Sequence, residues 1–204
     1  QIITEGSYYA RHMLKAEQDG HVGYFPYIPE LPVHTAWDIG VDDYSAVWFI
    51  QEDGLEARII DYYELSGGGI EDIVNDTFPE LNPDPALSVA GLVEIGREFP
   101  YEYGTHFMPH DIMVREWGRG AKTRYQTAQE WGLKPINKGV AVGPIERINA
   151  VRALFPQLRF NDTKRVRHGM KRINRYHRKW NDSMQSYTTP AHDENSHGAD
   201  ALGE

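Results

Sequence analysis

The 204-residue sequence contains no cysteine, which excludes a disulfide scaffold, a thiol nucleophile and a cysteine-ligated zinc site. It also lacks any apolar run approaching the ~20 residues of a membrane-spanning helix. The remaining composition, 40% hydrophobic and 25% charged residues, is that of a globular chain. Its length fits one domain, alone or with a small appendage. Because the chain starts at Gln1 without a Met, we expect a processed or excised part of a longer protein.

Basic residues are scarce in the first half of the chain. Residues 1–116 contain 22 Asp and Glu against 5 Lys and Arg, whereas residues 117–204 contain 8 acidic and 16 basic residues. The net charge of −9 therefore conceals an acidic half and a basic half. Such asymmetry favours a polyanionic partner for the second half, and the alternative is two solvated faces of one surface.

Hydrophobic periodicity predicts a mixed α/β fold. We expect strands at residues 33–39, 45–51, 56–65, 105–108 and 133–137, the first three forming an antiparallel meander. We expect helices at residues 6–18, 70–78, 86–99, 122–131, 143–154 and 163–180, and a last helix from about residue 196. A meander followed by alternating helices and strands indicates a central five-stranded mixed sheet with helices on both faces.

Three aspartates lie at positions that suit a catalytic or metal-binding carboxylate. Asp38 closes the first predicted strand, Asp111 follows another strand, and Asp200 lies on the last helix, where His197 shares its face. A charge within an apolar strand is unfavourable unless it is paired or binds metal. Clustered carboxylates repel one another, and Mg²⁺, which prefers oxygen ligands, relieves that repulsion. Two such ions can activate a water and stabilise the leaving oxygen of a phosphodiester.

Three motifs in this order resemble the nuclease domain of the large terminase subunit, the DNA-packaging motor of tailed bacteriophages. They are residues 37–43 (WDIGVDD), 108–112 (MPHDI) and 196–201 (SHGADA), and the resemblance covers nearly the whole chain. It implies an RNase H-like fold, with Asp38, Asp111 and Asp200 as catalytic ligands of one or two Mg²⁺ or Mn²⁺ ions. It also implies that residues 1–32 join the nuclease domain, residues 33–204, to an ATPase domain outside this chain.

Further groups are secondary candidates for the site. His197 could orient Asp200 or contact a phosphate. A fourth acid on the first long helix would be Glu71 or Asp72, although acids are also ordinary in a first helical turn. The remaining secondary candidates are Asp43, Asp61 and Asp193.

The basic residues concentrate between residues 159 and 179, where nine of 21 residues are Lys or Arg. On a continuous helix they form two adjacent columns at seven-residue spacing, which suit a phosphate backbone. A solvated helix face is the alternative. A basic loop at residues 118–124 could also touch DNA. The expected DNA-contacting residues are Arg119, Lys122, Arg124, Lys164, Arg165, Lys171, Arg172, Arg175, Arg178 and Lys179.

The resemblance thus implies a metal-dependent endonuclease that cuts double-stranded concatemeric DNA with little sequence preference. Its partners would be the ATPase domain of the same polypeptide, the small terminase subunit and the portal, in the cytoplasm of an infected bacterium. No membrane partner is expected. One alternative is another RNase H-like nuclease of the Holliday-junction resolvase or transposase type. Another is a non-catalytic module that grips DNA or docks within the motor.

Overall fold

The computed structural model describes residues 6–40, 43–115 and 122–204. At its centre is the predicted antiparallel meander of strands β2 (Val33–Asp38), β3 (Tyr44–Asp53) and β4 (Glu56–Ser66). The strands are rich in aliphatic and aromatic residues, which suit a pleated surface covered on both faces. Ala36 pairs with Trp48, which pairs with Tyr62 in turn, so the three side chains form a row across one face of the sheet.

Four further strands extend this meander into a seven-stranded mixed sheet within the described residues. Strand β5 (Tyr103–Met108) runs parallel to β2, and β6 (Ile136–Lys138) runs parallel to β5. On the other side, β7 (Leu158–Asn161) runs parallel to β4, and β1 (Val22–Gly23) lies outside β7. The mixed sheet is confirmed, but the expected strand number of five is too low. Strands β1 and β7 were missed because two and four residues are too short to show a period.

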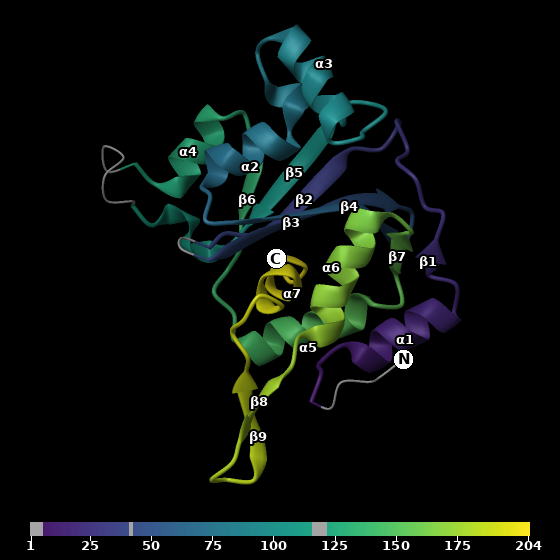
Figure 1. The fold of residues 1–204 in the computed structure, drawn as a ribbon, viewed down its shortest axis with the longest axis vertical. Helices are drawn as coiled ribbons and strands as arrows, with labels where there is room; N and C mark the ends of the chain where they lie inside the picture. Colours follow the sequence, from purple (N-terminus) through teal and green to yellow (C-terminus); the bar gives the residue numbers. More distant parts are fainter. Residues whose placement is uncertain (1–5, 41–42, 116–121) are drawn as a thin grey trace.

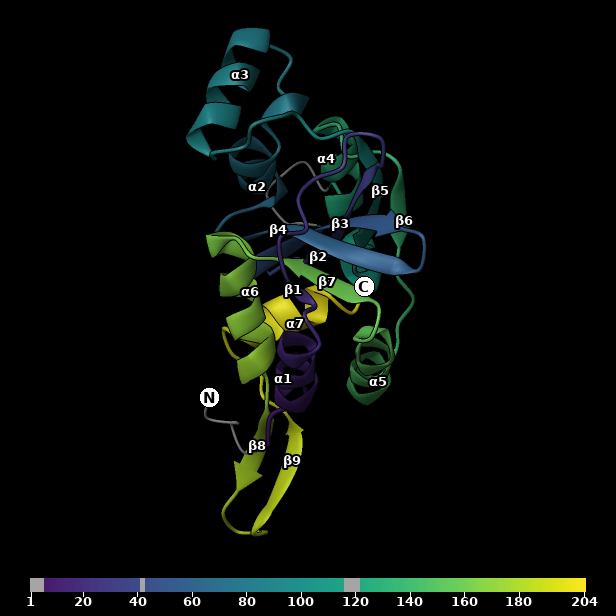
Figure 2. The ribbon, with the colours of Figure 1, turned by 90° about the vertical axis from the view of Figure 1, so that its right-hand side faces the viewer.

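Helices cover both faces of the sheet, as predicted (Figures 1 and 2). The α-helices are α1 (Ala10–Gln18), α2 (Ile70–Thr77), α3 (Pro85–Glu94), α4 (Arg124–Glu130), α5 (Pro144–Leu154), α6 (Lys164–Arg175) and α7 (Ser196–Ala201). Helices α2 and α4 lie on one face, over a core that includes Trp37 and Phe49. Helices α1, α5, α6 and α7 lie on the other. None of the described helices is long and apolar enough to cross a bilayer.

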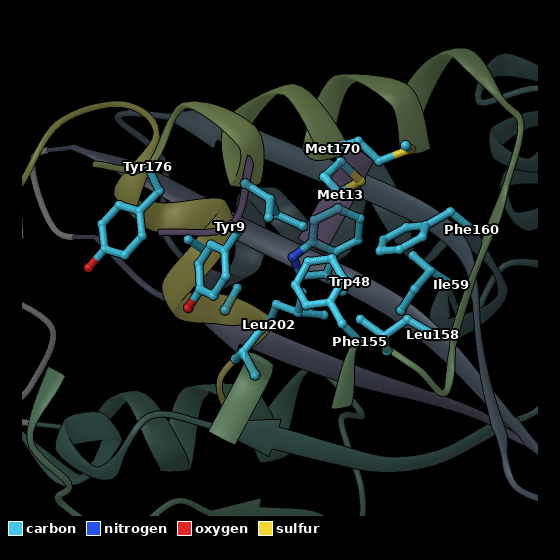
Figure 3. Close-up of a cluster of buried hydrophobic side chains, with 14 of the residues drawn as sticks. Tyr9, Met13, Trp48, Ile59, Phe155, Leu158, Phe160, Met170, Tyr176 and Leu202 are labelled. Carbon is cyan, nitrogen blue, oxygen red and sulfur yellow. The ribbon is translucent and has the colours of Figure 1, made fainter. Parts of the chain in front are cut away.

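The second face holds the larger core, in which Trp48 is surrounded by side chains from distant parts of the chain (Figure 3). Met13 lies on α1 and Tyr9 directly precedes this helix. Met170 lies on α6, and Leu202 directly follows α7. Helix α1 therefore packs into the same core as the sheet, through Met13 and Ala16. Strand β1 also extends the sheet directly.

The predicted basic helix over residues 163–180 is too long. Thr163 caps its start, since its side chain accepts a hydrogen bond from the backbone N–H of Val166, and the helix ends at Arg175. Tyr176 has an extended backbone, and the chain continues as β8 (Arg178–Asn181), paired with β9 (Ser186–Pro190). This hairpin projects away from the sheet (Figure 1). Basic residues continue through residue 179, so composition gave no sign of the helix end.

Candidate functional site

The ends of two neighbouring parallel strands bring Asp38 and Asp111 to one edge of the sheet. Strand β2 pairs with β5 so that Ala36 lies beside Phe107, and Asp38 follows two residues later. After β5 the chain turns into a 3₁₀ helix, His110–Met113, that carries Asp111. The carboxyl ends of parallel strands meet at the same edge, where ligand sites of α/β sheets form. Asp38 is half-buried and Asp111 is exposed, so both carboxylates remain accessible from solvent.

Helix α7 lies directly against the sheet and is held there by its backbone. The indole Nε1 of Trp48 donates a hydrogen bond of 2.7 Å to the carbonyl oxygen of Gly198. Gly198 also packs closely against Tyr62 and Arg172, which leaves little space for a side chain at this position. The helix can approach the sheet this closely because Gly198 has no Cβ. The two candidate residues on either side of Gly198, His197 and Asp200, are thereby placed beside the end of β2.

His197 contacts two of the candidate aspartates. Its side chain is 4% exposed; Nδ1 lies 2.8 Å from Oδ2 of Asp38, and Nε2 lies 3.1 Å from Oδ2 of Asp43. Burial lowers the pKa of His197, but its contacts with Asp38 and Asp43 raise it more, so the net pKa is raised. The pKa of Asp43 is lowered by the backbone N–H of Tyr44 and by His197.

Asp200 is largely removed from solvent and lies in the field of another carboxylate. Burial, followed by the negative charge of Asp38, raises the pKa of Asp200 to about 6. Arg147 of α5 opposes this shift, with Nη1 at 3.8 Å from Oδ1 of Asp200. Such a raised pKa means that the fold places a carboxylate where its charge is poorly compensated.

A fourth acid, Glu204, belongs to the same surroundings and was not predicted. Its Oε1 lies 2.9 Å from Nη2 of Arg147, and its side chain is buried. Burial raises the pKa of Glu204; Arg147 opposes this, and the charges of Asp38 and Asp111 add to it. Neither Arg147 nor Glu204 belongs to a recognisable motif, so the sequence carried no signal for this pair.

The other secondary candidates lie in different surroundings. Asp61 is buried in β4 and paired with Arg165 at 2.6 and 2.7 Å, which satisfies its carboxylate. Asp72 accepts a hydrogen bond from the backbone N–H of Gly69 at the start of α2, and Glu71 is half-buried in the same turn. That helix packs on the face opposite to α7. Asp193 caps the turn before α7 by accepting from the backbone N–H of Asn195.

The basic residues divide into two groups. Arg165 and Arg172 point to the sheet, where Arg165 pairs with Asp61 and Arg172 with Glu64 at 2.6 Å. The expected columns of exposed basic side chains therefore contain fewer residues than predicted, because Arg165 and Arg172 form ion pairs that stabilise the fold. The remaining members of the expected set on α6 and β8 are solvent-exposed: Lys164, Lys171, Arg175, Arg178 and Lys179.

The basic loop before α4 contributes less than expected in the part that the structure describes. Lys122 pairs with Glu130 at 2.8 Å, and both side chains are exposed. Arg124 is buried and donates to the carbonyl oxygen of Ile39. Arg119 lies outside the described residues.

No protein-family model matches the sequence, and no curated protein matches it. Several solved structures do match this chain in their fold. The large terminase of a thermophilic bacteriophage superposes with a TM-score of 0.55 at 15% identity, over 91% of this chain and 42% of that one. The P22 large terminase nuclease domain gives a TM-score of 0.55 at 15% identity, over 90% of this chain and 84% of that one.

The large terminase nuclease of a second thermophilic phage, G20c, solved with bound cobalt, gives a TM-score of 0.54 at 15% identity, over 98% of this chain and 97% of that one. It was also solved with bound magnesium, with a TM-score of 0.52 at 14% identity over the same shares. At these identities the likeness concerns the fold. The chain thus has the RNase H-like fold of large terminase nuclease domains, and it spans less than half the length of the first of these large terminases.

Proposed function

We propose that this chain is the metal-dependent endonuclease domain of a large terminase subunit. The observation that carries the proposal is the fold shared with terminase nuclease domains, in which Asp38 and Asp111 follow neighbouring parallel strands and Asp200 lies in the field of Asp38. Three separate segments supply these acids, and the charge of Asp38 contributes to the raised pKa of Asp200. Burial is the main cause of that shift and the charge of Asp38 the second. Structural ion pairs pull carboxylate pKa values down, so a raised carboxylate pKa favours a functional site.

The residues present fit one or two hard divalent cations. Asp200 and Glu204 both have raised pKa values, and Arg147 compensates them only in part. Oxygen ligands are the preferred surroundings of Mg²⁺ or Mn²⁺. The G20c nuclease, which shares the fold, was solved with magnesium and cobalt. We assign Asp38, Asp111 and Asp200 as the ligands, with Oδ2 of Asp38 oriented by His197.

The chemistry that the cation supplies is activation of a water and stabilisation of the departing 3′-oxygen of the phosphodiester. The protein's own part is to fix the ligands. His197 holds the Asp38 carboxylate in one orientation, and Trp48 fixes α7 against the sheet through its hydrogen bond to Gly198. Arg147 of α5 contacts the carboxylates of both Asp200 and Glu204.

Double-stranded DNA is the substrate that the basic surface fits. Lys164, Lys171 and Arg175 recur at positions i, i+7 and i+11 of α6, so they project from one side of the helix, which packs beside α7. Point charges of this kind contact phosphates and carry no sequence information, so cutting would show little sequence preference. Arg178 and Lys179 extend this surface onto β8.

The biological setting follows the terminase interpretation. The chain matches 42% of the length of the first large terminase described above, so we expect an ATPase domain in the same polypeptide. The small terminase subunit, the portal and concatemeric DNA in the host cytoplasm would be its partners during genome packaging. Cutting of the concatemer would then release a packaged genome.

Plasmid nicking and linearisation tests this proposal, with Mg²⁺, Mn²⁺ or EDTA present. Asp111→Asn should abolish the metal-dependent cutting. Glu98→Gln is the matched control, because Glu98 is exposed on a loop and has no ion pair among the described residues. Equal cutting by Asp111→Asn would refute the assignment of Asp111. A folded wild-type chain that binds DNA without metal and cuts nothing would favour the gripping module instead. Preference for branched DNA would favour a resolvase-type enzyme.

A further inference from the structure

Three side chains beside the carboxylate site offer a different set of ligand atoms. Asp43, His192 and His197 each place one donor atom within 4.8 Å of the other two. Oδ2 of Asp43 lies 3.1 Å from Nε2 of His197 and 3.9 Å from Nε2 of His192. Donor atoms bound tetrahedrally at 2.0–2.1 Å from a metal are about 3.3 Å apart. The cluster therefore needs only a small contraction to surround an ion.

The buried member of the cluster has an unsatisfied nitrogen that faces the other two ligands. The His197 side chain is 4% exposed, and its Nε2 has no hydrogen-bond partner among the described residues, although Oδ2 of Asp43 lies 3.1 Å away. Leaving a buried ring nitrogen without a partner is unfavourable. A bound cation would satisfy it.

The other ring nitrogen of His197 is already oriented. Nδ1 lies 2.8 Å from Oδ2 of Asp38, so in the neutral imidazole that a metal binds, donation of the Nδ1–H to this carboxylate leaves Nε2 with a lone pair. A carboxylate that fixes the far nitrogen is the usual support of a metal-ligating histidine. The same bond leaves the other oxygen of Asp38 for the carboxylate site.

His192 supplies the mobile part of the cluster. It lies between β9 and α7, and its side chain is 71% exposed. Nδ1 is 3.3 Å from Oγ of Ser196, which leaves Nε2 directed at Asp43. Because this ring is mostly open to solvent, it can move the short distance that closing around an ion requires.

We propose that Asp43, His192 and His197 form a second divalent-cation site, separate from the carboxylate site and selective for metals that favour imidazole. Two imidazole nitrogens and one carboxylate oxygen suit Zn²⁺ or Co²⁺, whereas Mg²⁺ prefers oxygen ligands alone. Three protein ligands leave a fourth position open to water or a phosphate oxygen. The proposal does not depend on the nuclease activity, since it rests on the geometry of these three residues.

Titration of the metal-free chain with Co²⁺ tests this site through the visible absorption of the ion. Cobalt held by imidazole in a low-coordinate site absorbs strongly, and cobalt among oxygen ligands and water absorbs weakly. We expect a strong band that persists in a large excess of Mg²⁺. His192→Gln should weaken the Co²⁺ affinity at least tenfold, since even the loss of a supporting contact costs about 10–100-fold.

Two control variants separate this site from others. His177→Gln changes another surface histidine outside the cluster and should leave the band unchanged. Asp111→Asn removes a proposed ligand of the carboxylate site and should abolish plasmid cutting while keeping the band. Thermal unfolding checks that His192→Gln is folded, as the exposure of His192 leads us to expect. Equal Co²⁺ affinity in His192→Gln, displacement of the band by Mg²⁺, or its loss in Asp111→Asn would each overturn the proposal.

Discussion

Nδ1 of His197 lies 2.8 Å from Oδ2 of Asp38, across 159 positions of the sequence. This contact joins the last helix to the end of a central strand, and it acts together with the hydrogen bond from Trp48 to the Gly198 carbonyl. It also explains why His197 is buried although histidine is usually only partly buried. The imidazole acts on the proposed reaction through Asp38, and its other nitrogen remains available to Asp43.

Asp200→Asn should abolish cutting and stabilise the fold. A pKa raised from 3.8 to about 6 means that ionising Asp200 in the folded state costs about 3 kcal/mol at neutral pH. The folded state holds its proton more tightly than the unfolded state, so this cost is absent below about pH 3.8 and complete above about pH 6. In EDTA, urea unfolding of the variant should show a gain approaching ~3 kcal/mol at pH 8 and little gain at pH 4.

Two results would contradict this expectation. The first is an equal gain at both pH values, which would place the effect in packing. The second is a variant that still cuts plasmid in Mn²⁺. Mg²⁺ or Mn²⁺ should stabilise the wild type more than the variant, because binding to the folded state adds to its stability.

The sequence predicted most of the fold because its longer elements have a clear period. The meander and the mixed sheet with helices on both faces were identified from alternating strands and amphipathic helices. Strand β7 was missed because its four residues are too few to show a period. The end of α6 was missed because Tyr176 leaves the helix without a Gly or Pro to signal it.

Candidate site residues could be proposed from the sequence only where a residue stood out against its local pattern. Asp38 interrupts an apolar strand, and Asp111 follows one, so both stood out. Arg147 and Glu204 meet through tertiary packing of α5 against the end of α7, which no local pattern encodes. His192 lies 149 and 5 positions from Asp43 and His197 in the sequence, so only the tertiary fold brings these three side chains together.

The exposed and buried basic residues of α6 should respond differently to substitution. Combined replacement of Lys164, Lys171 and Arg175 by Ala should weaken DNA binding by a similar factor for every sequence. The slope of log K against log salt concentration should fall by about 0.9 for each phosphate that is no longer neutralised. Each replacement should change the free energy of unfolding by less than about 0.5 kcal/mol, because these side chains are exposed.

Arg172→Ala serves as the contrast. Its guanidinium is buried and paired with Glu64 at 2.6 Å, so truncation leaves a buried carboxylate without its main partner. We expect a destabilisation of about 3–5 kcal/mol, measured by urea unfolding.

The DNA affinity of the variant with Lys164, Lys171 and Arg175 replaced is measured by fluorescence anisotropy at two salt concentrations. An unchanged affinity would exclude this face of α6 as the DNA surface.

Glu64→Gln should lower stability in a pH-dependent way. Burial raises the pKa of Glu64, but hydrogen bonds from Arg172, His168 and Tyr62 lower it more, to about 2. This carboxylate therefore stabilises the fold fully above about pH 4.5 and loses that contribution as the pH falls toward about 2. The variant should be about 3 kcal/mol less stable than the wild type at pH 7. The difference should shrink through that acidic window, whereas Glu98→Gln should show no such change.

Gly198→Ala should disturb the site without touching any proposed ligand. A Cβ at this position would lie 2.9 Å from the hydroxyl oxygen of Tyr62 and 3.1 Å from Cβ of Arg172. Both neighbours are buried and held by ion pairs or hydrogen bonds, so α7 must move away from the sheet. We expect a destabilisation of about 1–3 kcal/mol, as for other overpacked cores. The movement should also strain the hydrogen bond from Trp48 to the Gly198 carbonyl.

The shift of α7 displaces His197 and Asp200 together, so metal-dependent cutting should fall further than the loss of folded protein explains. Single-turnover cleavage in saturating Mn²⁺, under conditions where the variant is fully folded, measures this excess. Gly23→Ala is the matched control, because a Cβ there meets only ordinary contact at 3.7 Å. It should change the free energy of unfolding by about 0.5 kcal/mol or less and leave cutting intact. Full activity in folded Gly198→Ala would show that the position of α7 does not limit the reaction, and Asp200 would then lose its assigned place in the site.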